Sequence, residues 1–373
     1  MDRNIEEGLK LMEALIKNTG LEDIYHRVKT GERLSKEEGI RLYQSPLLAV
    51  GYLANIVRER LHGKRTYYVY NQHINYSNVC INLCKFCAFG RPKNDPKAFT
   101  FSLKDIEEKL KNRIKEPIHE VHIVGGLHPD LAFDYYLEIL HLIHKLRPEA
   151  CIKAYTATEI GHFSKISRKS IEEILTALKE AGLTALPGGG AEVFSPRVRK
   201  LVCPKKMSGK EWLEISKIAH RLGILTNATL LYGHLETLEE RIEHLLALRE
   251  AQDETAGFIC FIPLSFHPKN TRLSYLPGPT GIDDLKTIAI SRLILDNIPH
   301  IKAYWIMLTP KLAQISLNFG ADDLDGTVIE ERITHMAGAI SEKSLTRSEL
   351  EGLIKETGHE PVERDTLFRR VNT

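Results

Sequence analysis

The sequence predicts an α/β protein built as a (β/α)8 barrel of the TIM type, with a helical extension before the barrel and a helical tail after it. Strand and helix signals alternate from residue 67 onward, and most strand signals are short, β-branched or aromatic, and bounded by Gly, Pro or Asn. Eight such units over about 260 residues suit a barrel, which typically needs ~250 residues. An open parallel sheet is the alternative architecture.

The chain divides into three predicted regions. We predict a helical N-terminal extension at residues 1–66, the barrel at 67–327 and a helical, polar tail at 328–373. The extension carries no chemical motif, and we expect it to cap one end of the barrel. Its helix patterns lie at 6–19, 35–45 and 46–63.

Within the barrel, strands and helices are expected in strict alternation. The predicted strands are 66–74, 120–126, 152–159, 183–189, 224–232, 257–266, 301–308 and 313–320. The predicted helices are 102–116, 132–146, 167–182, 208–223, 237–252 and 281–297. Several of these helices begin at Ser or Thr and end near Gly, as helix capping requires.

Composition excludes several classes of function. The apolar fraction of 43% and the charged fraction of 27% are those of a soluble globular protein. The formal net charge is only +2, and the Lys/Arg tracts RPK and PKK are short, so we interpret them as solvated surface and expect no nucleic-acid partner. No apolar stretch reaches the ~18 residues that a bilayer span needs, and the N-terminus lacks a signal-peptide core. We therefore expect a cytoplasmic protein whose thiols stay reduced.

Three of the six cysteines lie close together, at Cys80, Cys84 and Cys87, with the spacing C-x3-C-x2-C. Iron–sulfur clusters are held by cysteine thiolates, normally four for a [4Fe–4S] cube, so three leave one iron free for another ligand. A structural zinc site could take His73 as a fourth ligand, but the second ligand pair typical of such sites is missing. We interpret Cys151 and Cys260 as core residues and Cys203 as a loop thiol.

Barrel enzymes place their active sites at the carboxyl ends of the strands. Glycines there allow close backbone approach to a ligand, and carboxylates such as Glu159 and Glu192 can accept hydrogen bonds from ribose hydroxyls. His128, which precedes a proline, is as well suited to capping its loop as to binding a ligand. The candidate residues at predicted strand ends are His73, Asn75, Gly125, Gly126, Glu159, Glu192, Asn227, His234, His267 and Tyr304.

The C-x3-C-x2-C motif ends in the stretch CKFCAF, in which an aromatic residue follows the last cysteine. This pattern resembles the signature of the radical S-adenosylmethionine (SAM) superfamily. This resemblance implies a [4Fe–4S] cluster on the three cysteines, with SAM chelated to the fourth iron and cleaved to a 5′-deoxyadenosyl radical. It also implies that the backbone of Gly125 and Gly126 meets the methionine amino group and that Phe86 lies beside the adenine. Leu127 stands where many members have Glu. The stretch that ends at Glu236 resembles a fifth-strand motif, in which this carboxylate fixes the loop.

The chain contains the longer blocks HINYSNVCINLCKFCAF, EVHIVGGLHPD, LPGGGAEVFSPRVRKLVCP, NATLLYGHLET, IPLSFHPKNT and DNIPHIKAYWIMLTPKLAQISLNFGADDLDGT. These blocks resemble one family within the superfamily, the aminodeoxyfutalosine synthases of the futalosine route to menaquinone. The resemblance implies addition of the deoxyadenosyl radical to 3-[(1-carboxyvinyl)oxy]benzoate, then rearrangement and loss of a carboxylate, giving 6-amino-6-deoxyfutalosine. It also implies an electron donor of the flavodoxin or ferredoxin type.

The two carboxylates of that substrate need cationic or hydrogen-bonding partners. We expect His234 or His267 to bind one of them, and Tyr304 or Trp305 to wall the aryl ring. The expected substrate-binding residues are His73, Asn75, Asn227, His234, His267 and Tyr304. Sister enzymes stay open as alternatives, namely cyclic dehypoxanthine-futalosine synthase and the deazaflavin-forming FO synthase subunit. A non-catalytic iron–sulfur electron-transfer or sensor protein is the alternative from another class.

Overall fold

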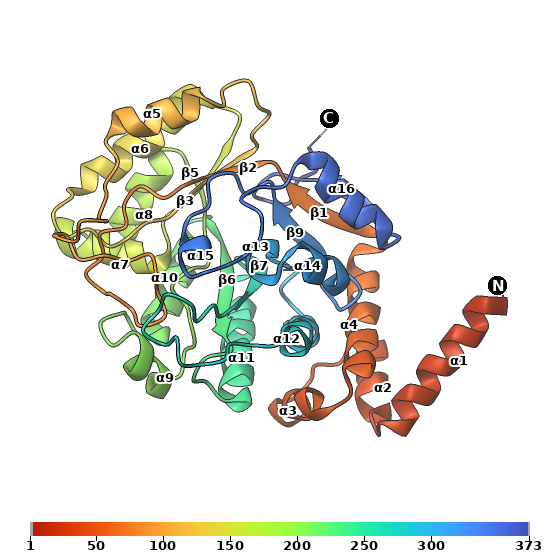
Figure 1. Ribbon diagram of the computed structural model, residues 1–373. Helices are drawn as coiled ribbons and strands as arrows, with labels where there is room; N and C mark the ends of the chain where they lie inside the picture. Colours follow the sequence, from red (N-terminus) through yellow and green to blue (C-terminus); the bar gives the residue numbers. More distant parts are fainter. Residues whose placement is uncertain (1–2, 372–373) are drawn as a thin grey trace.

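Seven parallel strands form one curved sheet in the computed structural model, which describes residues 3–371 (Figure 1). Their order in space follows their order in the chain, as expected for repeated βα units. The strands are β2 (Asn71–Ile74), β3 (Glu120–Ile123), β4 (Cys151–Ala154), β5 (Leu183–Leu186), β6 (Leu225–Tyr232), β7 (Phe258–Ser265) and β8 (His300–Ile301).

Three further parallel strands, ordered β10-β1-β9, form a second sheet. They are β10 (Glu360–Glu363), β1 (Arg65–Val69) and β9 (Asp323–Gly326). The segment around β9 closes the barrel, because its backbone bonds to both edges of the seven-stranded sheet. On one side the amide of Ala303 donates to the carbonyl of Asp323 (2.8 Å), and on the other the amide of His73 donates to the carbonyl of Ile329 (2.8 Å). The predicted α/β barrel class is confirmed, with this segment in the eighth position.

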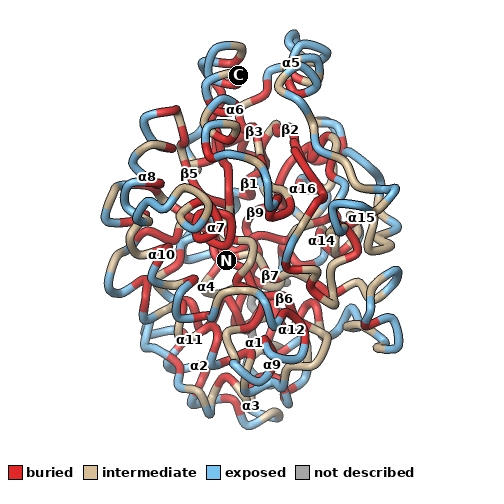
Figure 2. Tube along the Cα trace, turned by 90° about the vertical axis from the view of Figure 1, so that its left-hand side faces the viewer, coloured by how far each residue is buried: buried red, intermediate tan, exposed pale blue. Residues whose placement is uncertain are grey.

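Helices cover the outside of the barrel, and their ends bear out the capping signals. Ser102, Ser170, Ser208 and Thr237 each form a capping box at the start of a predicted barrel helix. The helices that follow the barrel strands are α5 (Leu103–Lys111), α6 (Phe133–Leu146), α7 (Ala157–Ser167), α8 (Ile171–Glu180), α9 (Pro196–Val202), α10 (Gly209–Arg221), α11 (Leu238–Thr255), α12 (Gly281–Ile294), α13 (Trp305–Leu308) and α14 (Pro310–Ser316). Figure 2 shows the buried residues concentrated along the central strands, with exposed residues on the outer turns.

Four N-terminal helices pack on the outside of this layer. They are α1 (Arg3–Asn18), α2 (Glu22–Thr30), α3 (Lys36–Gln44) and α4 (Leu47–His62). Helix α4 packs against α12, and α3 against α11 and α12. A Cβ atom at Gly51 of α4 would lie 2.4 Å from the ring of Phe319, so a residue without a side chain lets α4 approach this closely. The described part of the extension thus covers the side of the barrel, and the end of α4 reaches the amino-terminal end of β8.

Four strand predictions are wrong in detail. The stretch 152–159 ends as a strand at Ala154, and its last three residues begin helix α7. The single strand predicted at 66–74 is two strands in different sheets, with Tyr70 between them. The stretch 301–308 leaves β8 after Ile301 and turns into α13. The stretch 313–320 is mostly helix and turn rather than strand, since Pro310 starts α14. The strand that takes this place, β9, has the sequence DLDG, which strand propensities do not reveal.

The tail is helical only in part. It holds α15 (Ile333–Met336) and α16 (Arg347–Glu356), and then β10 returns to pair with β1. The extents proposed for the three regions remain a prediction, and residues 1–2 and 372–373, at their outer limits, lie outside the described part of the chain.

Candidate functional site

A cavity of about 330 Å³ opens at the carboxyl ends of the barrel strands, within the range of small-molecule sites. The cysteine loop after β2 and the tips of the other strands line it. Two residues expected at the site, His234 and Trp305, are not part of its lining. The expected site residues that do line it are His73, Asn75, Cys80, Cys84, Phe86, Cys87, Gly125, Gly126, Glu159, Glu192, Asn227, His267 and Tyr304.

The three predicted cysteines of the loop face this cavity together. Cys84 is buried, whereas Cys80 and Cys87 are partly exposed. Backbone bonds fix the loop: the amide of Cys80 donates to the carbonyl of Arg91 (2.9 Å), and the amide of Gly90 donates to Cys87 Sγ (3.3 Å). Burial raises the pKa of Cys87 to about 11. The thiol is therefore protonated near neutral pH until a metal displaces the proton, as iron and zinc do.

Cys203 is not the loop thiol that we expected. It is 1% exposed at the end of α9, next to Cys84, and a hydrogen bond between the two thiols, together with burial, raises the pKa of Cys84. Cys203 does not line the cavity. Cys151 and Cys260 are buried, as predicted. Of the six cysteines, three therefore present sulfur to the cavity.

We call the part of the cavity that the three cysteines line the cluster end. It contains an ion pair that the sequence did not reveal. Lys206 pairs with Glu192 and lies over the ring of Phe86, 5.6 Å from its centroid. The PKK tract that contains Lys206 had the pattern of solvated surface, but this lysine lines the cavity. A lysine ammonium can donate three hydrogen bonds, and Glu192 accepts one of them. Lys206 can therefore also donate to the carboxylate of a ligand.

Glu159 serves the architecture of the site rather than a ribose. Its Oε1 accepts from the hydroxyl of Tyr76 (2.7 Å) and the amide of Gly125 (3.1 Å), and its Oε2 caps helix α7 at Thr156. We expected Glu159 at a strand end, but it lies in the first turn of α7, and both oxygens are already bonded. It orients the Gly125–Gly126 turn.

The Gly-Gly turn is required by close packing with the chain that follows β2. A Cβ atom at Gly126 would lie 2.2 Å from the carbonyl oxygen of Val79, and one at Gly125 would lie 2.5 Å from the ring of Tyr76. The turn therefore holds the start of the cysteine loop against the end of β3. His128 caps its own loop, since its Nδ1 accepts from the amide of Asp130 (3.1 Å).

The structure does not bring His234 into the cavity, so its expected contact with substrate is not supported. Its side chain is buried beside Glu236, with Nδ1 3.0 Å from the carboxylate. Glu236 also accepts from the amide of Gly233, and it pairs with Arg241 at 2.8 Å. These partners outweigh burial and lower the pKa of Glu236 to about 2. The predicted loop-fixing role of Glu236 is consistent with this position.

The other expected histidine, His267, does line the cavity. Its Nε2 donates to the carbonyl of Met307 (2.9 Å), and burial lowers its pKa, so it offers Nδ1 as a neutral acceptor. Tyr304 is part of the lining, whereas Trp305 is fully buried and donates to the carbonyl of Gly326 (2.8 Å). Of the two aromatic residues expected to wall an aryl ring, Tyr304 lines the cavity and Trp305 does not.

Lys153, Lys302 and Asp325 line the cavity, and fully buried Glu120 lies behind them against Lys153; we call these four side chains the charged floor. Strand register places His73, His122 and Lys153 in one row across β2, β3 and β4. Lys153 pairs with Glu120 at 2.7 Å, and Lys302 pairs with Asp325. The signal for these residues was present, since a lysine inside a short buried strand such as CIKA needs a partner.

Some cavity groups have no protein partner. Asn75 Oδ1 and Thr158 Oγ1 are buried and unbonded, although both residues line the cavity. Buried polar atoms normally find a partner, so these two indicate a polar ligand. With three convergent thiols, they form a donor set that suits an iron–sulfur cluster and a polar co-substrate such as SAM.

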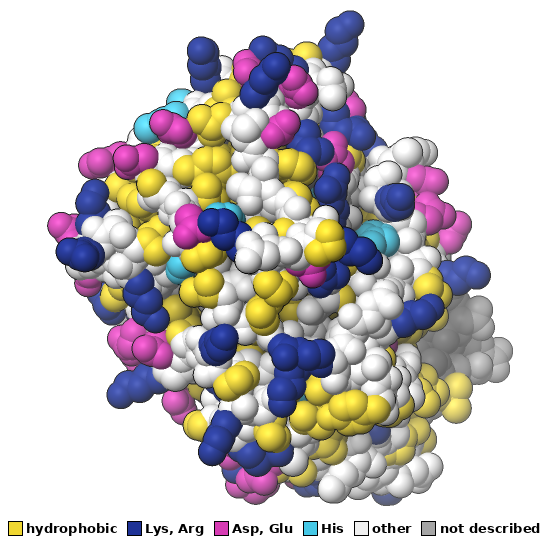
Figure 3. All heavy atoms as spheres, turned by 60° about the vertical axis from the view of Figure 1, so that its left-hand side comes forward, with side chains coloured by type: hydrophobic (Ala, Val, Ile, Leu, Met, Phe, Trp, Pro, Cys, Tyr) yellow, Lys and Arg dark blue, Asp and Glu magenta, His cyan; other side chains and the backbone are white. Residues whose placement is uncertain are grey.

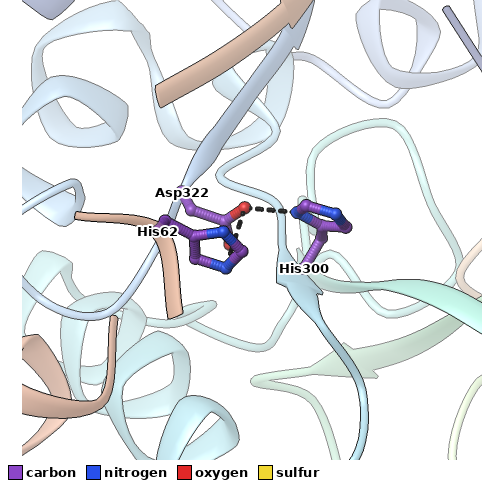
Figure 4. A group of neighbouring side chains, drawn as sticks. All are labelled: His62, His300 and Asp322. Atoms are coloured by element: carbon purple, nitrogen blue, oxygen red, sulfur yellow. Dashed lines mark hydrogen bonds and ion pairs between the residues drawn. The ribbon is translucent and has the colours of Figure 1, made fainter. Parts of the chain in front are cut away.

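A second group of potential metal ligands lies outside the cavity. His62, His300 and Asp322 each place a ligand atom within 4.8 Å of the others (Figure 4). However, Asp322 already pairs with buried Arg292 and with His300 at 2.6 Å, and His62 Nε2 donates to the carbonyl of Pro299. A divalent cation would be repelled by the guanidinium, so we interpret this group as a link between α4, β8 and the start of β9.

Comparison with protein families gives two matches that together cover most of the chain. Residues 74–248 match the radical SAM superfamily, and residues 255–372 match the CofH/MqnC C-terminal region. In the described part of the chain, no helix combines the length and apolar character needed to cross a membrane.

Curated relatives and solved structures agree with these matches. The aminodeoxyfutalosine synthase of Thermus thermophilus is 48% identical over 95% of this chain and 97% of its own, and that of Streptomyces coelicolor is 41% identical over 93% and 92%. A 5-amino-6-(D-ribitylamino)uracil–L-tyrosine 4-hydroxyphenyl transferase of Methanosarcina barkeri is 42% identical over 94% of each chain.

Methylornithine synthase shares the fold, with a TM-score of 0.73 at 17% identity over 90% of this chain and 96% of its own. The [FeFe]-hydrogenase maturase HydG also gives 0.73, at 17% identity over 97% and 80%. From its relatives and its family matches, the chain is an enzyme of the radical SAM superfamily and belongs to the group of transferases that carry the CofH/MqnC C-terminal region.

Proposed function

We propose that this enzyme is an aminodeoxyfutalosine synthase. In the proposed reaction it joins the 5′-deoxyadenosyl group of SAM to 3-[(1-carboxyvinyl)oxy]benzoate, with rearrangement and loss of one carboxylate as bicarbonate. The products are 6-amino-6-deoxyfutalosine and methionine. The observation that carries the proposal is 48% identity, over nearly the whole of both chains, to a synthase of that name.

Membership of the superfamily implies a [4Fe–4S] cluster and SAM. We propose Cys80, Cys84 and Cys87 as the cluster ligands. When bound, the cluster supplies the electron that cleaves SAM to methionine and the deoxyadenosyl radical. The protein's own contribution is to place the reacting carbon beside the alkene and to exclude water, since a reactive species held close to its target needs no diffusion.

At the cluster end we propose that Phe86, Glu192 and Lys206 bind SAM. Lys206 supplies a cation for a carboxylate, and Phe86 supplies a flat apolar face that suits an adenine. Gly125 and Gly126 shape this end, and Glu159 holds them in place. The arrangement keeps Lys206 neutralised by Glu192 until a ligand enters.

The substrate side of the cavity has donors for two carboxylates. Lys153 and Lys302 are each 2% exposed and line the cavity, and we add them to the residues expected from the sequence. The expected residues that lie in the cavity are His73, Asn75, Asn227, His267 and Tyr304. We propose that Tyr304 walls the aryl ring while Asn75 and the two lysines receive a carboxylate.

A product assay tests the proposal. Anaerobic enzyme is incubated with SAM, dithionite and 3-[(1-carboxyvinyl)oxy]benzoate, and the products are separated and weighed by mass spectrometry. The proposal requires a product that contains the adenosyl group joined to the benzoate. Free 5′-deoxyadenosine as the sole nucleoside product would indicate hydrogen abstraction instead and would overturn the proposal.

The transferase relatives support a second candidate in the same group. Several of them, at 38% to 42% identity, carry the name 5-amino-6-(D-ribitylamino)uracil–L-tyrosine 4-hydroxyphenyl transferase. This candidate predicts turnover with tyrosine and 5-amino-6-(D-ribitylamino)uracil in the same assay, with free 5′-deoxyadenosine released.

We place the protein in the cytoplasm, with an electron carrier of the flavodoxin or ferredoxin type as its partner.

A further inference from the structure

Basic residues are concentrated in three chain segments around the cysteine loop. The segments are 80–93, 196–206 and 266–280, and together they contain ten Lys or Arg residues and no Asp or Glu. The whole chain has 51 basic and 49 acidic residues, so an even mixture would have placed several acidic residues here. The basic character is therefore a local property of the surface near the three cysteines.

The three segments are neighbours in space. The amide of Lys85, between Cys84 and Cys87, donates to the carbonyl of Val202 at the end of α9 (2.8 Å). The amide of Arg272 donates in turn to the carbonyl of Lys85 (2.9 Å), and its guanidinium donates to the carbonyl of Leu83. The segments thus form one continuous face around the loop. Figure 3 is turned toward this side of the molecule and shows Lys and Arg side chains interspersed with hydrophobic ones.

Much of this positive charge is not neutralised by the protein. Lys93, Arg197 and Lys206 have carboxylate partners. Within residues 3–371, five outward-facing cations of these segments have no ion pair, and we call them the basic rim: Lys85, Lys200, Lys205, Lys269 and Arg272.

Exposed apolar side chains accompany the basic rim. Tyr275 is 72% exposed, Ile81 44% and Leu201 41%, and each lies in one of the three segments. Large apolar side chains among unpaired charges are the composition of a protein-binding surface, in which the apolar groups supply buried area and the charges supply steering. A small-molecule site would be concave, whereas these residues lie on exposed loops and on α9.

We propose that the basic rim is the docking surface for an acidic one-electron carrier protein. This inference rests on the proposed function, because SAM would be cleaved only by a cluster that has first been reduced by one electron. The overall reaction consumes no net electron, so the carrier serves to prime the cluster and to restore it when the electron is lost. The carrier's flavin or iron–sulfur centre is oxidised by one electron and the cluster is reduced by one, with no bond formed between the proteins. Lys85 lies between two cluster cysteines, so a carrier that contacts it brings its centre to the near side of the cluster.

Charge reversal at Lys200 and Lys205 tests this surface, since both side chains are exposed and lie outside the cysteine loop. The probe is a purified acidic flavodoxin, and its Kd for the cluster-loaded enzyme is measured at low and at high ionic strength. We expect Lys200→Glu combined with Lys205→Glu to weaken binding by about tenfold or more at low salt, as for charge pairs at protein interfaces. The wild-type Kd should itself rise with salt, which screens charges beyond ~10 Å at 0.1 M.

Lys64→Glu is the matched control. Lys64 is exposed and precedes β1, at the opposite end of the barrel from the cysteine loop. It should leave the Kd unchanged. A second variant, Lys269→Glu, should weaken binding in the same direction. The docking proposal is overturned if the double variant binds flavodoxin as tightly as wild type does, or if Lys64→Glu weakens binding equally.

Turnover measured with two reductants completes the test. The rate at which flavodoxin reduces the cluster of the double variant, read from the onset of turnover, should fall at least as far as its binding. Reduction by dithionite, and the turnover that follows it, should stay at the wild-type level, because a small reductant needs no docking surface. Equal loss with both reductants would contradict the proposal. If wild-type enzyme gives no adenosyl product with dithionite but still binds flavodoxin with salt sensitivity, the proposed reaction fails while the docking surface stands.

Discussion

The charged floor and the upper cavity, by which we mean the part of the lining around Asn75 and Thr158, both contain buried polar side chains, but their hydrogen-bonding groups are satisfied differently. At the floor, Lys153 pairs with Glu120 at 2.7 Å, and the hydroxyl of Thr366 reaches the same carboxylate at 2.8 Å. Nearer the mouth, Asn75 Oδ1 and Thr158 Oγ1 are buried with no partner. The floor is therefore largely complete without a ligand, whereas the upper cavity is not.

This difference predicts where stability is lost. Breaking a buried ion pair leaves an uncompensated charge in a medium of low dielectric, so changes at the floor should destabilise the fold, in addition to removing the substrate contact proposed for Lys153 and Lys302. Removing a polar group that has no protein partner removes little from the folded state, so changes in the upper cavity should affect ligands instead. The experiments below test whether the two ends behave so differently.

The largest effect is expected from Cys84→Ser. Serine keeps the size of the side chain but is a poor iron ligand, so the variant should lose the cluster and all detectable turnover. Its thermal unfolding in the absence of metal should stay close to that of metal-free wild type. Cys260→Ser, at a buried cysteine away from the cavity, is the matched control and should retain iron. Turnover that survived in Cys84→Ser would remove this cysteine from the site.

Lys153→Met should give the largest loss of stability. Methionine fills a similar volume but leaves Glu120 without its principal buried cation, and such a loss costs about 3–5 kcal/mol. Denaturant unfolding measures it, with Lys145→Met, at an exposed lysine on α6, as the control. A variant as stable as wild type would show that the charged floor is not the completed network described above.

Titration of His73 and His122, which lie in one row with Lys153 of the charged floor, should make the stability of the protein depend on pH. His73 and His122 stack with their ring centroids 4.4 Å apart, and burial lowers the pKa of both below the usual histidine value of 6.5. The unfolded chain then binds protons that the folded one rejects, so stability is full above pH 6.5 and is lost as pH falls below it.

His122→Gln should flatten this dependence, because it removes one of the two groups and relieves the other of a neighbouring charge. Denaturant midpoints between pH 7.5 and pH 5.5, compared with wild type, measure the effect. If the denaturant midpoint of His122→Gln changed with pH as steeply as that of wild type, His73 and His122 would not differ in protonation between the folded and unfolded states.

The smallest effect is expected from Thr158→Val in the upper cavity. The change removes a buried hydroxyl that has no partner, so stability should hold or rise slightly. Loss of one hydrogen bond to a ligand is worth about 1 kcal/mol, or roughly fivefold in KM for SAM or for the benzoate substrate. Thr156→Val, by contrast, removes a helix cap and should lower stability. If neither KM changed in Thr158→Val, the hydroxyl would have no ligand role.

The sequence predicted those features that depend on local patterns. Capping residues and amphipathic spacing located the long barrel helices, and the cysteine spacing located the loop that faces the cavity. The eighth barrel position was missed because β9 reads DLDG, and its extended form depends on partners at β1 and β8 that are distant in the chain. A single stretch, 66–74, was divided between two sheets for the same reason.

At the site, residue positions could be predicted more readily than residue roles. Glu159 reached the cavity but spends both oxygens on Tyr76, Gly125 and Thr156, which strand-end reasoning could not show. Lys206 lay in a basic tract that is usually solvated. His234 lies next to a strand end, yet Glu236 draws it away from the cavity. Each of these depends on side-chain partners from elsewhere in the fold.

The central claim is that three cysteines hold a cluster with one iron open to SAM. Anaerobically reconstituted wild-type protein, reduced with dithionite, should contain about four irons per chain. Its electron paramagnetic resonance signal should change on addition of SAM. Stoichiometric zinc in place of iron, or a reduced cluster whose signal is indifferent to SAM, would contradict the account.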